Sequence, residues 1–502
     1  MDSQSRRSSI PNRSPEALYH VVPNLDEQED GPSNDSTIEL AGDTTADPFP
    51  APTDPPPELL NIQIKWVFFI LGCAVLLPWN VIITALPFFQ SRMVNSTLRS
   101  SFTSYLTTSF TLANLLFLAH ATTVSKQTIP SRQNHSSMVW LVILNFCLTL
   151  STLYTPSPAV FFAFIVFNAI AQATAGAYIA TSSMAVASLF GPAAIQTMIS
   201  GQAAVAIAVS GVQVIGAATA VISKPKTSEV SDGAAETRSA FFFFSLSTLF
   251  LIFAVFAHRW LVKTPEYQHV AAALERGPKN STAEHGHNSE RRSLIGRRNS
   301  LLGPISDSRA NTLRVAKQNI TYEIAVCYTF LITLAVFPPI TASVKPTNPR
   351  IHPLLFSAVH FFMFNIGDFS GRYFCSIPRF LIWDARKLLI LSLARTLFIP
   401  LFLMCNVQRG ASADPTKPPI FNSDIIFMLL LFFLGWTSGY VSSLCLMSAA
   451  SLDHNPRLKG KVEDVDIAAT VGNFCLCLGL ALGSCASFAV KAAICGCNPF
   501  SN

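Results

Sequence analysis

Residues 361–372 read Phe-Phe-Met-Phe-Asn-Ile-Gly-Asp-Phe-Ser-Gly-Arg, and this stretch decides the class of fold. It places Asp368 four residues before Arg372, a spacing that puts an acid and a base on one helix face, where they pair across one turn. The flanking sequence is apolar, from Pro353 before the stretch to Cys375 after it. Because ionisable residues inside a membrane span are costly, they mark functional sites by default. We therefore interpret the stretch as part of a membrane span in which Asp368 pairs with Arg372.

The composition of the chain agrees with this interpretation. Hydrophobic residues make up 50% of the 502 residues and charged residues only 13%, whereas a soluble protein carries about 25% charged residues. The net charge of +6 lies mostly in loops between apolar segments, so it does not call for a nucleic acid partner. The eleven cysteines are scattered, without the spacing of a disulfide framework or a zinc site. We expect no metal and no cofactor.

Hydropathy predicts an all-α polytopic membrane protein with about eleven transmembrane helices, six before a long loop and five after it. The expected spans cover about 64–89, 101–124, 137–155, 159–189, 194–222, 240–262, 320–344, 353–376, 386–405, 423–451 and 465–493.

Four regions follow from these spans. Residues 1–60 are polar and rich in Ser, Pro and acidic residues, and are expected to form a disordered cytosolic tail. Residues 61–262 form a six-helix bundle, 263–318 a basic cytosolic loop and 319–502 a five-helix bundle. Lys and Arg gather in the loops after the second, sixth, eighth and tenth spans, which places the N-terminus in the cytosol.

Two short motifs in the loops bear on modification and sorting. Asn95 begins Asn-Ser-Thr in the first non-cytosolic loop and is a candidate for glycosylation. Glu290, Leu294 and Ile295 in the long loop have the spacing of an endolysosomal sorting signal, through which a sorting adaptor would bind. The alternative is a basic loop with occasional leucines, so the choice between plasma membrane and vacuolar or lysosomal membrane stays open.

Several polar residues lie inside the expected spans. Pro78 kinks the first span, and beside it Trp79 and Asn80 present an aromatic face and an amide to a cavity, or serve as an interfacial Trp and a kink-stabilising Asn. Gln172 and Gln202 lie among small residues, where an amide also serves helix packing. Together with one acid–base pair of zero net charge, this set suits a neutral solute with a flat aromatic part. His360, two turns before Asp368, is a structural residue or a pH sensor.

The motifs resemble the equilibrative nucleoside transporter family. Leu76-Leu-Pro-Trp-Asn80 and Phe364-Asn-Ile-Gly-Asp-Phe-Ser-Gly-Arg372 carry the resemblance. It continues in collinear order over about residues 64–493, in the stretches 199–202, 337–338, 438–440 and 477–483. The resemblance implies a fold related to the major facilitator superfamily without its twelfth helix. It also implies alternating-access transport of nucleosides by facilitated diffusion, without ATP.

The resemblance also implies roles for individual residues. Leu76 and Trp79 would pack against the nucleobase with Ile83 in the same pocket, and Gln172 would hydrogen-bond to the edge of the base. Asp368 and Arg372 would engage the ribose or hold a gate. The remaining residues assigned to this substrate site are Asn80, Phe361 and Asn365, and those assigned to gating or helix packing are Pro78, Gln202 and Gly371.

Two departures from the family pattern leave the base preference, and nucleoside against free nucleobase, open. Gln202 is followed by Ala-Ala-Val where the family often has glycines, and Ile366-Gly367 replaces a bulkier pair.

Other classes of protein remain as alternatives. The spacing Asp368-x-x-Gly371-Arg372 also matches a gating signature of the general facilitator superfamily, which includes proton-coupled transporters of other small neutral solutes. An intramembrane aspartyl protease needs two facing acids, and only Glu323 rivals Asp368 inside the spans. The pattern therefore favours a transporter over an enzyme.

Overall fold

A computed structural model describes residues 60–93, 98–222, 234–276, 303–407 and 420–495 of the chain. These residues form helices joined by short connections, with two isolated β-bridges and no strand among them. Asn95 and the motif of Glu290, Leu294 and Ile295 lie outside the described residues, as does nearly all of the expected tail.

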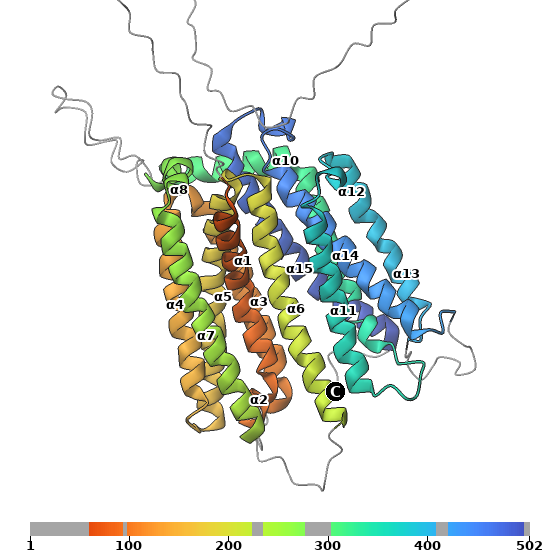
Figure 1. The fold of residues 1–502 in the computed structure, drawn as a ribbon. Coiled ribbons are helices and arrows are strands. Elements are labelled where there is room, and N and C mark those ends of the chain that lie inside the picture. Colours follow the sequence, from red (N-terminus) through yellow and green to blue (C-terminus); the bar gives the residue numbers. More distant parts are fainter. Residues whose placement is uncertain (1–59, 94–97, 223–233, 277–302, 408–419, 496–502) are drawn as a thin grey trace, which may run out of the picture. The chain divides into compact units, whose positions relative to one another are not determined.

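The helices fall into two groups along the chain (Figure 1). The first group, the N-terminal half, comprises α1 (Ile62–Thr84), α2 (Leu86–Ser91), α3 (Leu98–Val124), α4 (Pro130–Ser151), α5 (Pro158–Leu189), α6 (Pro192–Ile222), α7 (Ala234–Lys263), α8 (Pro265–Val270) and α9 (Ala272–Glu275). The second group, the C-terminal half, comprises α10 (Gly303–Val336), α11 (Pro353–Phe374), α12 (Ala385–Ala394), α13 (Phe398–Leu403), α14 (Asp424–Ala449) and α15 (Val465–Cys495).

The expected fold class, an all-helical polytopic membrane protein, is confirmed. Among the described residues, seven segments are long and apolar enough to cross a membrane, and they are Ile62–Ser91, Pro158–Leu189, Pro192–Thr219, Glu236–Lys263, Ser308–Ser343, Asp424–Ala449 and Val462–Ala493. The number eleven stays a prediction. Large apolar side chains point outward from these helices, for example Phe167 (71% exposed) and Leu246 (67% exposed). Such surface is suited to lipid, because soluble monomers rarely expose extensive apolar patches.

The structure differs from the expected helices in two places. The loop expected over 263–318 contains α8, α9 and the first part of α10. Hydropathy detects only the apolar part of a helix, whereas α10 begins with a polar segment at Gly303. The span expected over 386–405 is instead two helices, α12 and α13, joined by the 3₁₀ turn η5 (Arg395–Leu397).

Close helix packing depends on glycines in both halves. A Cβ atom at Gly371 of α11 would lie 2.0 Å from the Trp436 carbonyl oxygen of α14, and one at Gly439 of α14 would lie 2.0 Å from the Asp368 carbonyl oxygen. In the N-terminal half, a Cβ at Gly72 of α1 would lie 1.9 Å from the Met198 carbonyl oxygen of α6. These distances leave no room for a side chain, so the backbones approach as small residues in membrane helices allow.

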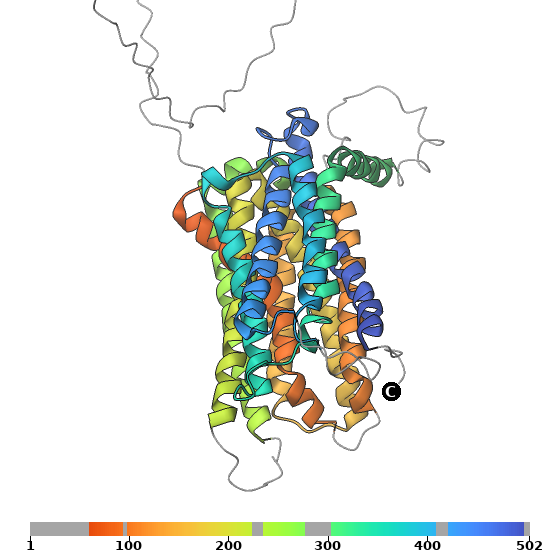
Figure 2. The same ribbon diagram turned by 90° about the vertical axis from the view of Figure 1, so that its right-hand side faces the viewer.

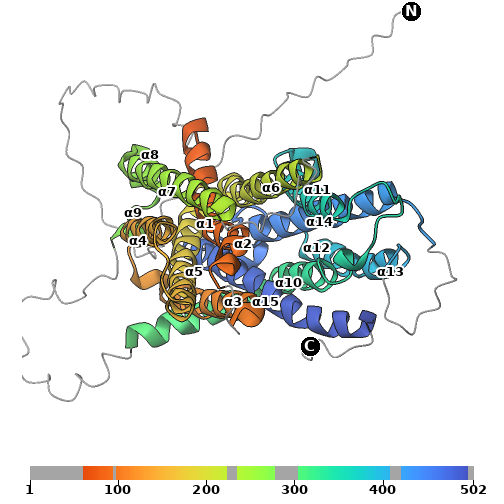
Figure 3. The same ribbon diagram turned by 90° about the horizontal axis from the view of Figure 1, so that it is seen from below.

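The two halves meet along two seams. Helix α6 packs against α11, and α15 packs against α3 and α5 (Figure 3). Helix α10 packs against α15, α14 and α12 within its own half, and these helices run side by side in the view of Figure 2.

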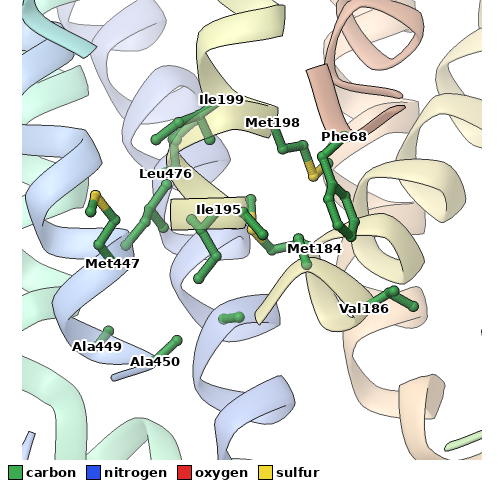
Figure 4. Packing of buried hydrophobic residues seen from close by; sticks show 14 of the residues in the cluster. Phe68, Met184, Val186, Ile195, Met198, Ile199, Met447, Ala449, Ala450 and Leu476 are labelled. Carbon is green, nitrogen blue, oxygen red and sulfur yellow. The ribbon is translucent and has the colours of Figure 1, made fainter. Parts of the chain in front are cut away.

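The buried apolar side chains divide the bundle into two levels. Near the end where α3 stops and α15 begins, called here the Lys126 end, one cluster joins both halves. Figure 4 shows part of this cluster, with Ile195 and Ile199 of α6 near Leu476 of α15 and Met447 of α14. Toward the opposite end, the N-terminal half has its own cluster around Phe88, Phe89 and Phe244, and the C-terminal half another around Phe337 and Phe427. The described core is therefore continuous between the halves only toward the Lys126 end.

Candidate functional site

Pro78 interrupts the hydrogen bonding of α1. It is buried and has no N–H to donate to Ala74, the residue four positions earlier. The side-chain amide of Asn80 donates to the Leu76 carbonyl oxygen at 3.0 Å, and the Thr84 hydroxyl donates to the Asn80 carbonyl oxygen at 2.8 Å. The NH₂ group of Asn80 thus supports the helix beside the kink, as the structural alternative expected.

Trp79 presents an aromatic face one residue after the kink. Its ring packs on Phe110 of α3, with the ring centroids 4.6 Å apart. Leu76, Trp79 and Ile83 are all only partly buried. Because their spacing is three and four residues, they lie on one face of α1. The three residues expected to contact a nucleobase therefore form one apolar surface.

Gln172 of α5 carries an unused acceptor. Its side chain is 1% exposed, and its Nε2 donates to Asn168 Oδ1 at 2.6 Å. Asn168 in turn donates to the Leu144 carbonyl oxygen of α4 at 3.0 Å, which fixes its orientation. The Oε1 of Gln172 is buried and has no hydrogen-bond partner among the described residues. A buried acceptor left unpaired is costly, so this atom is a candidate contact for a bound ligand.

Asp368 and Arg372 form the ion pair that their spacing predicted. Arg372 Nε donates to Asp368 Oδ2 at 2.8 Å, with side chains 8% and 13% exposed respectively. Arg372 Nη1 also donates to the Ile199 carbonyl oxygen of α6 at 3.2 Å, and Gln196 Nε2 of α6 donates to the Arg372 carbonyl oxygen at 3.0 Å. The pair therefore lies on the seam between the two halves.

Asn365 continues the same seam. Its Nδ2 donates to the Ala206 carbonyl oxygen of α6 at 3.3 Å. Gln202, between these contacts on α6, is partly buried. Phe361 packs edge-on against Phe337 at 5.2 Å between ring centroids.

His360 is held by its neighbours rather than aimed at the polar residues of α11. Its Nε2 lies 2.8 Å from Thr341 Oγ1, and its ring packs on Phe337, Phe361 and Phe427. These contacts match the structural interpretation of a satisfied histidine.

Arg395 is a buried charge that the sequence analysis missed. It is 2% exposed, lies in η5 and interacts electrostatically with Asp368. Its guanidinium donates to Thr333 Oγ1 at 2.7 Å, to the Leu434 carbonyl oxygen at 3.1 Å and to the Thr437 hydroxyl. Arg395 is thus a second buried base in the C-terminal half, besides Arg372 of the Asp368 pair. An arginine inside the span expected over 386–405 was the available signal.

The candidate residues share one level of the bundle. On α1, the 76–79 segment lies between Ala74 of the joint cluster and Val81 of the N-terminal cluster. On α5, Gln172 lies between Ala175 of the joint cluster and Ala169 of the N-terminal one. The polar residues of α11 likewise precede Cys375 of the joint cluster and follow Phe356 of the C-terminal one. These residues of α1, α5 and α11 are called here the polar layer. The polar layer therefore lies at the level where the buried apolar core no longer connects the two halves.

Polar contacts hold the halves together at the Lys126 end. Lys126, in the turn η1 (Ser125–Gln127), pairs with Asp466 of α15 at 2.6 Å and donates to the Glu463 carbonyl oxygen at 2.8 Å. Ser308 of α10 donates to the Thr123 carbonyl oxygen of α3 at 3.2 Å. The ion pair borders a cavity of about 830 Å³ whose walls come from both halves.

The fold defines the class of protein. The chain resembles the fucose:proton symporter FucP of Escherichia coli, with a TM-score of 0.52, 12% identity, and 87% of this chain and 94% of that one covered. This likeness establishes a fold shared with that symporter, and the multi-pass helices make the chain an integral membrane protein.

The sequence comparisons establish the family. A family model described as nucleoside transporter matches residues 164–492, well over half of the chain. The chain belongs to the nucleoside transporter family, as the resemblance of its motifs predicted. It is 26% identical over 465 residues to equilibrative nucleoside transporter 1 of Rattus norvegicus, and 27% identical over 467 residues to equilibrative nucleoside transporter 2 of Homo sapiens. Both alignments cover 85% of this chain and 96% of the relative.

Proposed function

We propose that the chain carries nucleosides across a membrane by facilitated diffusion, without ATP. The observation that carries this proposal is the polar layer at the point where the core stops bridging the halves. Transporters of this kind bind substrate near the midplane, between two halves that rock against each other. The names of the relatives supply the substrate class.

The residues of the layer suit the parts of a nucleoside. A flat base packs on the apolar face of Leu76, Trp79 and Ile83, where stacking tolerates different bases. The unused Oε1 of Gln172 accepts a hydrogen bond from an N–H on the edge of the base. Asp368, with one oxygen committed to Arg372, has a second oxygen that can accept from a ribose hydroxyl.

The same polar groups favour nucleosides over free nucleobases. A site with buried polar groups binds weakly any analogue that lacks the matching hydrogen-bonding group, because the polar groups of the site are then left unpaired. A nucleobase has no ribose to engage Asp368, so we expect it to be a weaker substrate. We expect Asn80, Phe361 and Asn365 to line the site beside these contacts, and Gln202 and Pro78 to serve the movement of α6 and α1.

Alternating access requires that the contacts between the halves break and re-form. At the Lys126 end this is the Lys126–Asp466 pair, and beside the polar layer these are the bonds of Arg372 and Gln196 across the seam. The Lys126 side chain is 28% exposed and that of Asp466 is 3% exposed, so water reaches this ion pair from the side of the lysine.

We place the N-terminus and the Lys126 end in the cytosol, from the distribution of Lys and Arg. This orientation puts Asn95 outside the cytosol, where it is available for glycosylation. It also puts Glu290, Leu294 and Ile295 inside, where a sorting adaptor is available. Replacing Leu294 and Ile295 by Ala moves the protein to the cell surface if the signal directs it to a vacuolar or lysosomal membrane, and leaves its distribution unchanged if it does not.

Transport by paired tryptophan variants tests the proposed site. Trp79→Ala removes the aromatic face, whereas Trp66→Ala removes a 59% exposed tryptophan from the same helix. We expect the first variant to raise KM for uridine by about 5- to 150-fold, since base–aromatic stacking contributes about 1–3 kcal/mol, and the second to leave KM unchanged. Equal effects of the two substitutions would remove Trp79 from the site and favour a general facilitator for another neutral solute.

A further inference from the structure

Glu323 is a buried acid outside the proposed substrate site. It lies in α10, is 3% exposed, and neither of its carboxylate oxygens has a hydrogen-bond partner of ordinary geometry among the described residues. Its Oε2 lies against bare backbone of α15, where a Cβ at Gly472 would be 3.8 Å away. Most buried polar groups find a good partner, so a carboxyl group with nothing stronger than a thiol beside it requires an explanation.

No cation balances this carboxyl group in the described part of the bundle. The titratable groups that interact with it are the thiols of Cys327 on α10, Cys445 on α14 and Cys475 on α15. The Cys475 thiol faces the carboxylate most directly, but a thiol is a weak donor. Only weakly polar groups therefore face Glu323 from these helices.

The cations of the neighbouring elements have other partners or face solvent. Arg457 of η6 (Pro456–Leu458) donates to Thr321 Oγ1 at 2.9 Å and to the Gln318 carbonyl oxygen at 3.3 Å. Beside α3, Lys126 pairs with Asp466. Arg314 is paired with Asp464, and Arg395 is bonded to Thr333, Leu434 and Thr437. The cations exposed to solvent are Arg309 and Lys317 of α10, Arg386 and Lys387 of α12, Lys459 and Lys461 beside η6, and Lys491 of α15.

Glu323 lies directly inside the contacts that close the Lys126 end of its half. One turn earlier on α10, Asn319 Nδ2 donates to the Ala449 carbonyl oxygen at 3.2 Å and Asn319 Oδ1 accepts from Asn455 at 2.9 Å. Beside it, the Tyr322 hydroxyl donates to the Trp383 carbonyl oxygen at 2.7 Å. These bonds tie α10 to the connections at that end and separate Glu323 from the water beyond them.

A charged carboxylate is unfavourable in this position. Burying an ion without a partner costs far more than burying a neutral group, so an isolated acid keeps its proton instead. In the closed arrangement Glu323 is therefore the neutral acid. Once the Lys126 end opens and water reaches it, glutamic acid at neutral pH gives up its proton to that water and becomes the carboxylate.

We propose that Glu323 is a proton-binding site, occupied while the Lys126 end is closed and emptied to the water on that side when this end opens. The proposal rests on the proposed function in one respect, because it requires alternating access. The proton enters and leaves from one side, so it sets the balance between the two arrangements and drives no accumulation of substrate. Acid pH stabilises the closed arrangement and neutral or alkaline pH favours opening.

The coupling between proton binding and closure determines how strongly pH changes the equilibrium between the closed and open arrangements. One proton bound in the closed arrangement and absent from the open one changes the equilibrium between them by up to about tenfold per pH unit. A side chain that cannot ionise removes this dependence.

The test is the initial rate of uridine uptake by full-length protein in proteoliposomes, with equal pH on both sides, from pH 5.5 to 8. We expect the wild-type rate to fall as the pH is lowered, and the rate of Glu323→Gln to be independent of pH. Glu323→Leu, similar in volume and equally unable to ionise, provides a second variant if the first folds poorly. The matched control is Glu463→Gln, which removes an exposed carboxylate at the same end of the bundle and should keep the wild-type pH profile.

The outcomes separate this proposal from the proposed function. A wild-type pH profile retained in both Glu323 variants overturns the proton site, as does a pH-independent wild type that transports uridine well. Wild-type protein that is folded and transports no nucleoside at any pH overturns the proposed function instead.

Discussion

Neutralising Asp368 is the perturbation whose consequence follows most directly from the structure. Asp368→Asn removes the carboxylate 2.8 Å from Arg372 Nε and leaves a guanidinium that is only 8% exposed without its acid. Removing one partner of a buried pair costs about 3–5 kcal/mol, because a charge stays buried without compensation. Arg372 keeps its bond to the Ile199 carbonyl oxygen, so we expect the lower limit, about 3 kcal/mol in the free energy of unfolding.

Thermal unfolding of purified protein in detergent measures this effect. The double variant Asp368→Asn with Arg372→Gln leaves no unpaired charge at these two positions, so it should recover much of the lost stability. Recovery should be incomplete, because Arg395 also interacts with Asp368. The control is Asp384→Asn, the same chemical change at an exposed helix cap that bonds the Arg386 amide at 2.7 Å. Asn caps a helix as well as Asp does, so stability should not change there. If Asp368→Asn is as stable as the wild type and transports at the wild-type rate, the pair has neither the structural nor the functional role assigned to it.

Three further predictions concern helix packing, the base contact and the closed end. Gly371→Ala should greatly reduce the yield of folded protein, because its Cβ would lie 2.0 Å from the Trp436 carbonyl oxygen. Gly216→Ala, which has open space around it, should not reduce the yield, and size-exclusion chromatography compares the yields of the two variants. Gln172→Leu should raise KM for nucleosides by about tenfold, because one lost hydrogen bond corresponds to about 1.4 kcal/mol. Analogues whose base lacks an N–H on that edge should compete with uridine equally well in the variant and in the wild type. Lys126→Glu should slow uptake by placing two acids together at the Lys126 end, and adding Asp466→Lys should restore it if the 2.6 Å pair forms during the cycle.

Local patterns in the sequence predicted what local physics determines. The spacing of Asp368 and Arg372 allowed only one pairing across a helical turn, and the structure contains it. The class of fold followed from apolar length alone. The partners of these residues across the seam, the Ile199 carbonyl oxygen and the Gln196 amide, depend on which helices become neighbours, and no local pattern specifies that.

The same limit explains the two buried charges that the sequence analysis did not place. Arg395 lies in an apolar stretch whose average hydropathy conceals a single arginine, and its partners come from α10 and α14. Glu323 was recognised only as a second acid, because the absence of partners around a carboxyl group becomes visible only when α14 and α15 are in position. Helix ends were also misjudged where a polar segment extends an apolar helix, as at the start of α10.

In the proposed function, this chain equilibrates nucleosides between two compartments. Its most direct test is the steady-state level of radiolabelled uridine and adenosine inside proteoliposomes without any imposed ion or pH gradient. We expect the internal concentration of each nucleoside to rise until it equals the external one, and an excess of unlabelled nucleoside to slow the approach. Folded protein that leaves the internal level at that of empty liposomes would contradict it.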